Sequence, residues 1–339
     1  MSHPWTDPAW RTEHLAWAGE RLDELGRRVD GEVEQRVAPW STVFRIPTDG
    51  GLAWSKANGP GAAHEGPLLG ILRGLGEHVA MLPVAVDARR AWLLLDDGGP
   101  TLRSRPAPDG RNGDTDLAAW TRILPAYAAL QRRSEGHVEA MLAVGVPDAR
   151  PTTAPATLAR LLADDPAWSR VAAADRAAAD AARAHLRALA PRVAELAAEL
   201  AASPIPASVD HGDLHGNNIV FGPDGGPRVF DWGDAVVAHP FATLTGTLGS
   251  IGHHAGLDAY GPELDGVREA YLTAWTDLAP LSTLDRLATL AMDLGHIAKA
   301  AAWERAVAGL APAEMGGHHG ATAAWLVDLA QRLEPRDST

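Results

Sequence analysis

Cysteine is absent from this chain, and lysine is nearly absent. Among 339 residues, lysine occurs only at Lys56 and Lys299, which leaves 28 of the 30 basic residues as arginine. Without cysteine, the chain can form no disulfide bond, no thiolate metal site and no cysteine nucleophile. A lysine ammonium is a compact point charge, whereas a guanidinium is a planar fork. In so arginine-rich a chain, each lysine therefore indicates a position where a guanidinium would not serve.

An excess of positive charge is also absent. The 43 acidic residues outnumber the 30 basic ones and give a formal net charge of −13 at pH 7. Such a chain repels the phosphates of nucleic acids and of anionic membranes, so neither is expected as a partner. No run of 18 apolar residues occurs, and charged residues are spread through the first 28 positions. We therefore expect no membrane or targeting segment, and a cytoplasmic location.

The length suggests two packed units of about 150 residues each. Residues 7 to 29 are predicted to form an amphipathic helix that Asp7 caps. Between residues 33 and 97, short apolar runs are broken by turn residues, for example at 47 to 51, and predict a small antiparallel sheet. One helix, at about 62 to 77, interrupts these strands.

Helical, alanine-rich segments dominate the chain beyond residue 106. The predicted helices cover residues 116–133, 137–144, 158–163, 174–202, 262–278, 284–308 and 320–333. Loop and two short strands are expected between about 203 and 230. The sequence thus predicts an α+β fold of two lobes. Residues 1–97 would form the smaller sheet lobe with one inserted helix, and residues 98–339 the larger helical lobe.

The chemically informative residues gather in one segment, 208 to 221, and in a shorter one that follows at 228 to 234. Two of the chain's four asparagines lie in the first segment, together with several histidines and aspartates. Apolar, strand-like runs flank these polar residues, so we expect them at strand ends that face a common cleft. Phosphoryl transfer requires such an inventory: a carboxylate near the acceptor hydroxyl, oxygen ligands for Mg²⁺ and a cation for the phosphates.

The segment 208–221 resembles the catalytic loop of the aminoglycoside phosphotransferase and choline kinase-like family, whose fold is similar to that of protein kinases. The pattern His-x-Asp-x-x-x-x-Asn is met by His211, Asp213 and Asn218, and Asp231 begins an Asp-Trp-Gly at the Asp-Phe-Gly position. The resemblance implies a kinase that uses ATP or GTP with Mg²⁺. Asp213 would be the catalytic base, Asn218 and Asp231 would hold Mg²⁺, and His211 would fix the loop through backbone contacts.

The same resemblance implies a nucleotide site in the first lobe. Lys56 lies on a predicted strand and would contact the phosphates, with Glu65 at the start of the inserted helix as its partner. The hinge that receives the adenine would lie around Asp97. The first hairpin has no glycine-rich phosphate loop, so Ser41 and Thr42 are the expected phosphate contacts there.

The family's acceptor pocket is built from the segment after Asp231 and from the C-terminal helices, which here offer acidic and aromatic side chains. The candidate acceptor residues are Asp234, Glu263, Trp275, Asp293, His296 and Trp303. Such a pocket suits a cationic hydroxyl compound, for example an aminoglycoside, an amino sugar or another basic antibiotic. An acidic surface that only keeps the protein soluble is an equal alternative.

Two other functions stay open from the sequence. The chain could be a kinase-like protein that binds nucleotide without turnover. The imidazoles and carboxylates of the segment would also suit a metal-dependent hydrolase, although that function leaves Asn218 and Lys56 without a role. The residues of that alternative cluster are His211, Asp213, His215, Asp231 and Asp234. The identity of the acceptor, the preferred nucleotide, protein partners and the oligomeric state are left open.

Overall fold

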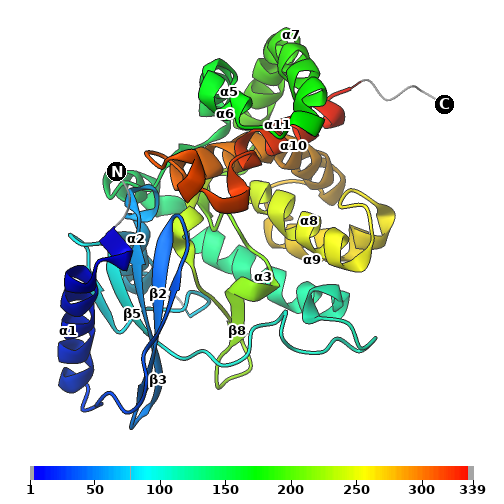
Figure 1. Ribbon diagram of the computed structural model, residues 1–339. Helices are drawn as coiled ribbons and strands as arrows, with labels where there is room; N and C mark the ends of the chain where they lie inside the picture. The colour runs from blue at the N-terminus through cyan, green and yellow to red at the C-terminus, as the bar shows by residue number, and fades with distance from the viewer. Residues whose placement is uncertain (1–3, 77, 335–339) are drawn as a thin grey trace.

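The computed structural model describes residues 4–76 and 78–334. It has a sheet lobe and a larger helical lobe (Figure 1), so the predicted α+β architecture is confirmed. The sheet lobe contains one five-stranded antiparallel sheet with the order β1-β2-β3-β5-β4. Its strands are β1 (Glu34–Val37), β2 (Ser41–Thr48), β3 (Gly51–Asn58), β4 (Ala85–Asp87) and β5 (Trp92–Asp96).

The hairpin of β2 and β3 forms at the turn that the sequence predicts. Thr48 pairs with Gly51 at its tip, and Gly51 takes a positive φ of 104°, which favours glycine. Successive side chains of a strand point to opposite faces, so the odd and even residues of β3 lie on different sides of the sheet. Ala53 and Ala57 face an apolar core, whereas Lys56 faces the other side.

Helix α1 (Pro8–Glu24) covers one face of the sheet (Figure 1). Its N-cap is Asp7, as predicted, and the carboxylate accepts a hydrogen bond from Ala9 N at 2.8 Å. The apolar side chains of α1 join those of the sheet in a separate small core, which contains Trp17, Ala18, Leu22, Phe44, Ile46, Ala53, Ala57, Trp92 and Leu94.

Helix α2 (Glu65–Gly74) is the predicted inserted helix. Its leucines at 68, 69 and 72 belong to the main hydrophobic core, together with side chains of the helical lobe. The inserted helix therefore ties the sheet lobe to the helical lobe, and its first residue, Glu65, lies at the junction of the two.

The helical lobe holds nine α-helices among the described residues. They are α3 (Leu117–Ser134), α4 (Val138–Ala143), α5 (Ala154–Ala163), α6 (Asp165–Ser169), α7 (Arg176–Ala201), α8 (Thr243–Ala255), α9 (Asp265–Leu272), α10 (Leu281–Ala306) and α11 (Ala321–Arg332). Short strands lie between α7 and α8: β7 (Ser208–Asp210), β8 (Ile219–Phe221), β9 (Pro227–Val229) and β10 (Val236–Ala238), with β6 (Asp148–Ala149) parallel to β10. In the described part of the chain, no helix is both long and apolar enough to cross a membrane.

Helix α8 is the main element that sequence reasoning missed. Its three glycines and three threonines are poor helix formers, and it forms because Leu244, Leu248 and Ile251 are buried in the main core. The helix predicted at 262–278 is shorter, since only α9 is α-helical there. The predicted division at residues 97 and 98 falls directly after β5, which ends at Asp96.

We predict that acid weakens the sheet lobe through His14, which α1 buries completely against the sheet. Its Nε2 lies 2.8 Å from Ser55 Oγ, and its Nδ1 has no partner. Burial, with a contribution from Arg90, lowers its pKa to about 4. As the pH falls below about 6.5, His14 is therefore protonated in the unfolded chain before it is protonated in the folded one. The free energy of unfolding falls between about pH 6.5 and pH 4, and the loss at pH 5 is about 2 kcal/mol.

Thermal unfolding at pH 7 and pH 5 measures this loss. His14→Phe keeps the ring among its aromatic neighbours and removes the titrating group, so its stability should fall less between the two pH values. An equal fall in the wild type and in His14→Phe would contradict the assignment.

Candidate active site

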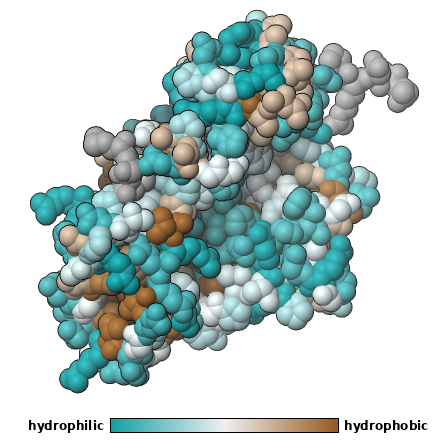
Figure 2. All heavy atoms as spheres, in the orientation of Figure 1, coloured by the Kyte–Doolittle hydropathy of each residue, from teal (hydrophilic) through white to brown (hydrophobic). Residues whose placement is uncertain are grey.

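A cleft of about 810 Å³ lies between the sheet lobe and the helical lobe. Figure 2 shows the surface hollowed between the two lobes, with mostly hydrophilic residues around the hollow. Both lobes contribute charged side chains to the cleft. Its lining includes Lys56 and Glu65 from the sheet lobe, and Asp213, Asn218 and Asp231 from the helical lobe. The structure therefore brings these five predicted residues together.

The loop between β7 and β8 is held in shape by His211. Its Nδ1 accepts the N–H of Asp213 at 3.3 Å, so its Nε2 carries the proton and donates to Phe230 O at 2.8 Å. Burial lowers the His211 pKa to about 4, which keeps the ring neutral. Gly212 has a φ of 75°, and a Cβ there would lie 2.2 Å from Asp234 O, so only glycine fits.

Asp213 presents a fixed carboxylate to the cleft. Its Oδ1 accepts from Lys299 Nζ at 2.8 Å, and its Oδ2 lies 3.1 Å from His215 Nε2. His215 Nδ1 accepts the N–H of Asn217, so its Nε2 carries the proton. Burial alone would raise the Asp213 pKa, but the Lys299 ammonium and His215 hold it well below its usual range. Asp213 is therefore ionised.

Asn218 and Asp231 place oxygen atoms on the cleft wall. Asn218 donates from Nδ2 to Asp213 O at 3.0 Å, which leaves its amide oxygen available to a cation. Asp231 follows β9 in the left-handed region, with φ 63° and ψ 60°, a conformation that costs a non-glycine residue about 1 to 3 kcal/mol. Its side chain is half exposed to the cleft.

These two side chains fit Mg²⁺, which prefers oxygen ligands and usually takes the rest of its shell from water and substrate phosphates. Within residues 4–76 and 78–334, no group of three or more His, Cys, Asp or Glu side chains is placed to hold a metal ion.

Glu65 and Lys56 form a buried network that joins the lobes. Lys56 Nζ donates to Glu65 Oε2 at 2.6 Å and to Asp231 Oδ1 at 2.5 Å. Glu65 also accepts from Asn58 Nδ2 at 2.7 Å and from Trp232 N at 2.9 Å. Burial would lower the Lys56 pKa, but Asp231 and Glu65 raise it above its usual value. Lys56 therefore keeps its charge inside the cleft, with the partner that the sequence predicts.

Asp97 lies at the end of β5, where the chain leaves the sheet lobe. Its Oδ1 accepts from Trp54 Nε1 at 2.8 Å, and both residues line the cleft. At the next residue, Gly98, a Cβ would lie 2.6 Å from a methyl of Val220, so the two lobes approach closely here. Apolar side chains from both lobes also line the cleft, namely Val43, Met81 and Leu95 of the sheet lobe and Val220 and Phe230 of the helical lobe.

Ser41 and Thr42, predicted to contact phosphate, do not line the cleft. Thr42 is fully buried, and its hydroxyl donates to Arg36 O at 3.0 Å and accepts from Gln35 at 3.1 Å. Ser41 is also buried. The neighbouring Trp40 and Val43 line the cleft instead.

Of the six predicted acceptor residues, only Asp234 and Trp303 line the cleft. Trp275 is fully buried in the core, where it packs against Phe241 and Tyr271. Glu263 is exposed and lies outside the cleft.

Asp293 and His296 also lie outside the cleft lining. Asp293 accepts from the Tyr260 hydroxyl at 3.0 Å. His296 lies 3.0 Å from Met292 O of its own helix, and its ring packs against Trp325 of α11. The structure therefore does not place these two residues, or Trp275 and Glu263, beside Asp213.

Two contributors to the loop were missed by sequence reasoning. Lys299 of α10 binds Asp213, and the scarcity of lysine was the signal that could have found it. Asp114 is fully buried, accepts from Gly216 N at 2.8 Å and pairs with Arg103. No local pattern marks Asp114, because its partner Gly216 lies 102 residues away.

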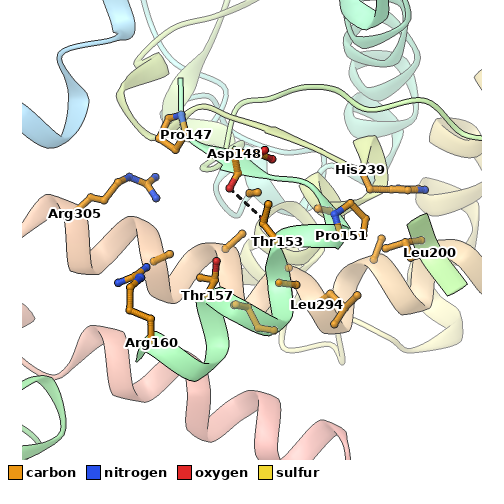
Figure 3. Close-up of a pocket in the computed structure, with 18 residues that line it drawn as sticks. Pro147, Asp148, Pro151, Thr153, Thr157, Arg160, Leu200, His239, Leu294 and Arg305 are labelled. Carbon is orange, nitrogen blue, oxygen red and sulfur yellow. Dashed lines mark hydrogen bonds between the residues drawn. The ribbon is translucent and has the colours of Figure 1, made fainter. Parts of the chain in front are cut away.

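A second, smaller cavity of about 200 Å³ lies beside the cleft, between β6, α5 and α10. Arg160 and Arg305 lie at one end of it, and Leu200 and His239 at the other (Figure 3). It contains none of the residues that converge around Asp213. Arg305 lines both spaces, and its Nε and Nη2 are buried without a partner among the described residues.

Comparison with known proteins gives a family match and several similar folds. The model of the phosphotransferase enzyme family matches residues 42–290. No curated protein matches the sequence.

Three solved structures resemble the fold at low sequence identity. The macrolide 2′-phosphotransferase of Brachybacterium faecium has 18% identity and a TM-score of 0.52, with 96% of this chain and 99% of that chain covered. The choline kinase of Streptococcus pneumoniae has 13% identity and a TM-score of 0.56, with 94% and 99% covered. A spectinomycin phosphotransferase, solved with ADP and spectinomycin, has 10% identity and a TM-score of 0.51, with 92% and 97% covered. These likenesses concern the fold.

We predict that Glu65 is a principal stabiliser of the junction between the lobes. Glu65→Ala leaves the Lys56 ammonium, the Asn58 amide and the Trp232 N–H without their shared acceptor. Removal of one partner of a buried ion pair typically costs about 3 to 5 kcal/mol, and denaturant unfolding measures it. Glu263→Ala removes an exposed carboxylate and should change the free energy of unfolding by less than about 0.5 kcal/mol. Equal effects of the two substitutions would contradict the prediction.

Proposed function

Because this chain belongs to the phosphotransferase enzyme family, we propose that it transfers the γ-phosphoryl group of ATP or GTP to a hydroxyl group of a small molecule. The observation that carries the proposal is the convergence of Lys56, Asp213, Asn218 and Asp231 on one cleft. Together they supply a cation for phosphates, a carboxylate for the acceptor and two oxygen ligands, which are the parts that phosphoryl transfer needs.

The nucleotide would lie in the part of the cleft beside the sheet. Its base would lie near Asp97, between the apolar side chains at the ends of β5 and β8, and its phosphates near Lys56. The Lys56 ammonium is already held by Glu65 and Asp231, so it needs little reorganisation to meet a phosphate. The complex of a similar fold with ADP supports a nucleotide in this role.

Asn218 and Asp231 would hold Mg²⁺. When bound, the ion neutralises charge on the nucleotide phosphates and orients them for transfer. The amide oxygen of Asn218 and the second carboxylate oxygen of Asp231 have no hydrogen-bond partner in the described part of the chain, which supports this assignment.

Asp213 would orient the acceptor hydroxyl and take its proton. In the transfer, the acceptor oxygen bonds to the γ-phosphorus. The bond from that phosphorus to the oxygen shared with the β-phosphorus breaks, and its electron pair leaves with the nucleoside diphosphate. The hydroxyl proton passes to Asp213. Assistance by such a base is worth roughly 10² to 10⁴ in rate.

One carboxylate and two aromatic rings of the cleft support a cationic acceptor. Asp234 lies in the cleft, and burial, with repulsion from Asp213, raises its pKa to about 6, so it is mostly ionised at pH 7. Trp40 and Trp303 also line this cleft, where their rings pack edge to face with centroids 5.4 Å apart and both contact His318, and aromatic rings attract cations. We therefore propose a basic hydroxyl compound, such as an aminoglycoside, an amino sugar or another basic antibiotic.

Asp213→Ala should lose nearly all turnover and keep nucleotide binding, because Asp213 meets the acceptor and Lys56 meets the phosphates. The measurements are the thermal shift with MgATP or MgGTP, and the release of nucleoside diphosphate with a panel of aminoglycosides, amino sugars and neutral sugars. We expect a shift in both proteins and acceptor-stimulated release from the wild type alone.

Three results would count against the proposal. The absence of both a nucleotide shift and acceptor-stimulated release would contradict the kinase function. Nucleotide binding without stimulated release for any acceptor would favour a binding protein without turnover. Stimulation by neutral sugars alone would contradict the cationic acceptor.

A further inference from the structure

Lys299 is the one lysine that the nucleotide site does not use, and it reaches the catalytic loop from α10. Its Nζ donates to Asp213 Oδ1 at 2.8 Å and to Gly212 O at 2.7 Å. The ammonium therefore binds the side chain of one loop residue and the backbone of the residue before it. These two contacts fix both the position of the loop and the orientation of the carboxylate.

We propose that Lys299 is a positioning residue for phosphoryl transfer, which clamps Asp213 so that one carboxylate oxygen faces the acceptor hydroxyl. The proposal rests on the proposed function of Asp213. The ammonium holds Oδ1, while Oδ2 lies 3.1 Å from the protonated Nε2 of His215 and would receive the acceptor hydroxyl at its remaining lone pair. The carboxylate can then turn only by breaking a charge-assisted hydrogen bond.

The surroundings of Lys299 favour this role over a surface ion pair. Its side chain is only 13% exposed, and its charge is balanced by Asp213, with Asp234 and Asp210 also contributing. The Nζ lies 5.3 Å from the ring centre of Trp325, which packs beside it. A buried ammonium among carboxylates makes a stronger and more directional contact than an exposed pair, which is worth little.

The geometry also explains why lysine stands here in an arginine-rich chain. One compact ammonium serves a carbonyl oxygen and a carboxylate oxygen from the same point, with its three rotatable donors. A guanidinium would distribute its donors over a larger planar fork and would displace the loop or the Trp325 ring. Lys299→Arg should therefore keep the charge and only part of the orientation.

The scarcity of lysine gives a test of the clamp that does not need activity. Protein grown on lysine with ¹³C at Cε and ¹⁵N at Nζ carries two labelled side chains, Lys56 and Lys299. The signal lost in Lys299→Arg identifies Lys299. Asp213→Asn should shift the Lys299 signal and leave the Lys56 signal in place, whereas Glu65→Gln should shift the Lys56 signal. An unchanged Lys299 signal in Asp213→Asn would overturn the proposal.

Kinetics then test the role in transfer. A misplaced catalytic group can cost roughly 100-fold, so Lys299→Met should lower kcat by about that factor, with KM for the nucleotide within about threefold. Lys299→Arg should be intermediate. In the Asp213→Asn background, Lys299→Met should cause no further loss, because the two residues act as one unit. A normal kcat in Lys299→Met, or full additivity of the two losses, would overturn the proposal.

Failure of the proposed function gives a different result. If the labelled Lys299 responds to Asp213→Asn but the wild type phosphorylates no acceptor, the ion pair stands. The function proposed for the cleft, and with it the role of the clamp, would then be wrong.

Discussion

Glu65 accepts hydrogen bonds from the Lys56 ammonium, the Asn58 amide and the Trp232 backbone N–H, and these donors come from both lobes. A buried carboxylate is costly unless it is paired and its oxygens are hydrogen-bonded. Here every partner is in place, so the lobes can adopt this arrangement without an unpaired charge. The cleft, the position of Lys56 and the approach of Asp231 all depend on that single acceptor.

The two lysines of the chain bind different aspartates of the cleft. Lys56 reaches it from the sheet lobe and binds Asp231, whereas Lys299 reaches it from the helical lobe and binds Asp213. Each ammonium is buried and each faces more than one acceptor oxygen. Each buried ammonium is therefore paired with at least one carboxylate, which offsets the cost of burying its charge. The only two lysines of the sequence thus both lie in this cleft.

Local patterns predicted the parts of the fold that local chemistry determines. The β2–β3 hairpin follows from its turn residues, the Asp7 cap from the first turn of α1, and the loop around Asp213 from the spacing of its polar residues. Helix α8 could not be predicted, because its glycines and threonines oppose a helix and only burial of Leu244 and its neighbours in the core stabilises it.

Predictions that needed the tertiary structure were less successful. Thr42 lies on the same face of β2 as Phe44 and Ile46, which pack towards α1, whereas Val43 lines the cleft. Adjacent residues of a strand point to opposite faces, so an assignment that is wrong by one residue selects a side chain on the wrong face. On α10, the face of His296 is covered by α11, and a helical period does not reveal which neighbour covers a face.

Phosphorus NMR of the wild-type protein with MgATP and a basic hydroxyl acceptor tests the central claim most directly, since it distinguishes transfer to a hydroxyl from transfer to water. We expect the γ-phosphate signal to be replaced by ADP and by a new phosphomonoester of the acceptor in equal amounts, and Asp213→Ala to give neither. Formation of ADP with inorganic phosphate alone, or the same phosphomonoester from Asp213→Ala, would contradict the account.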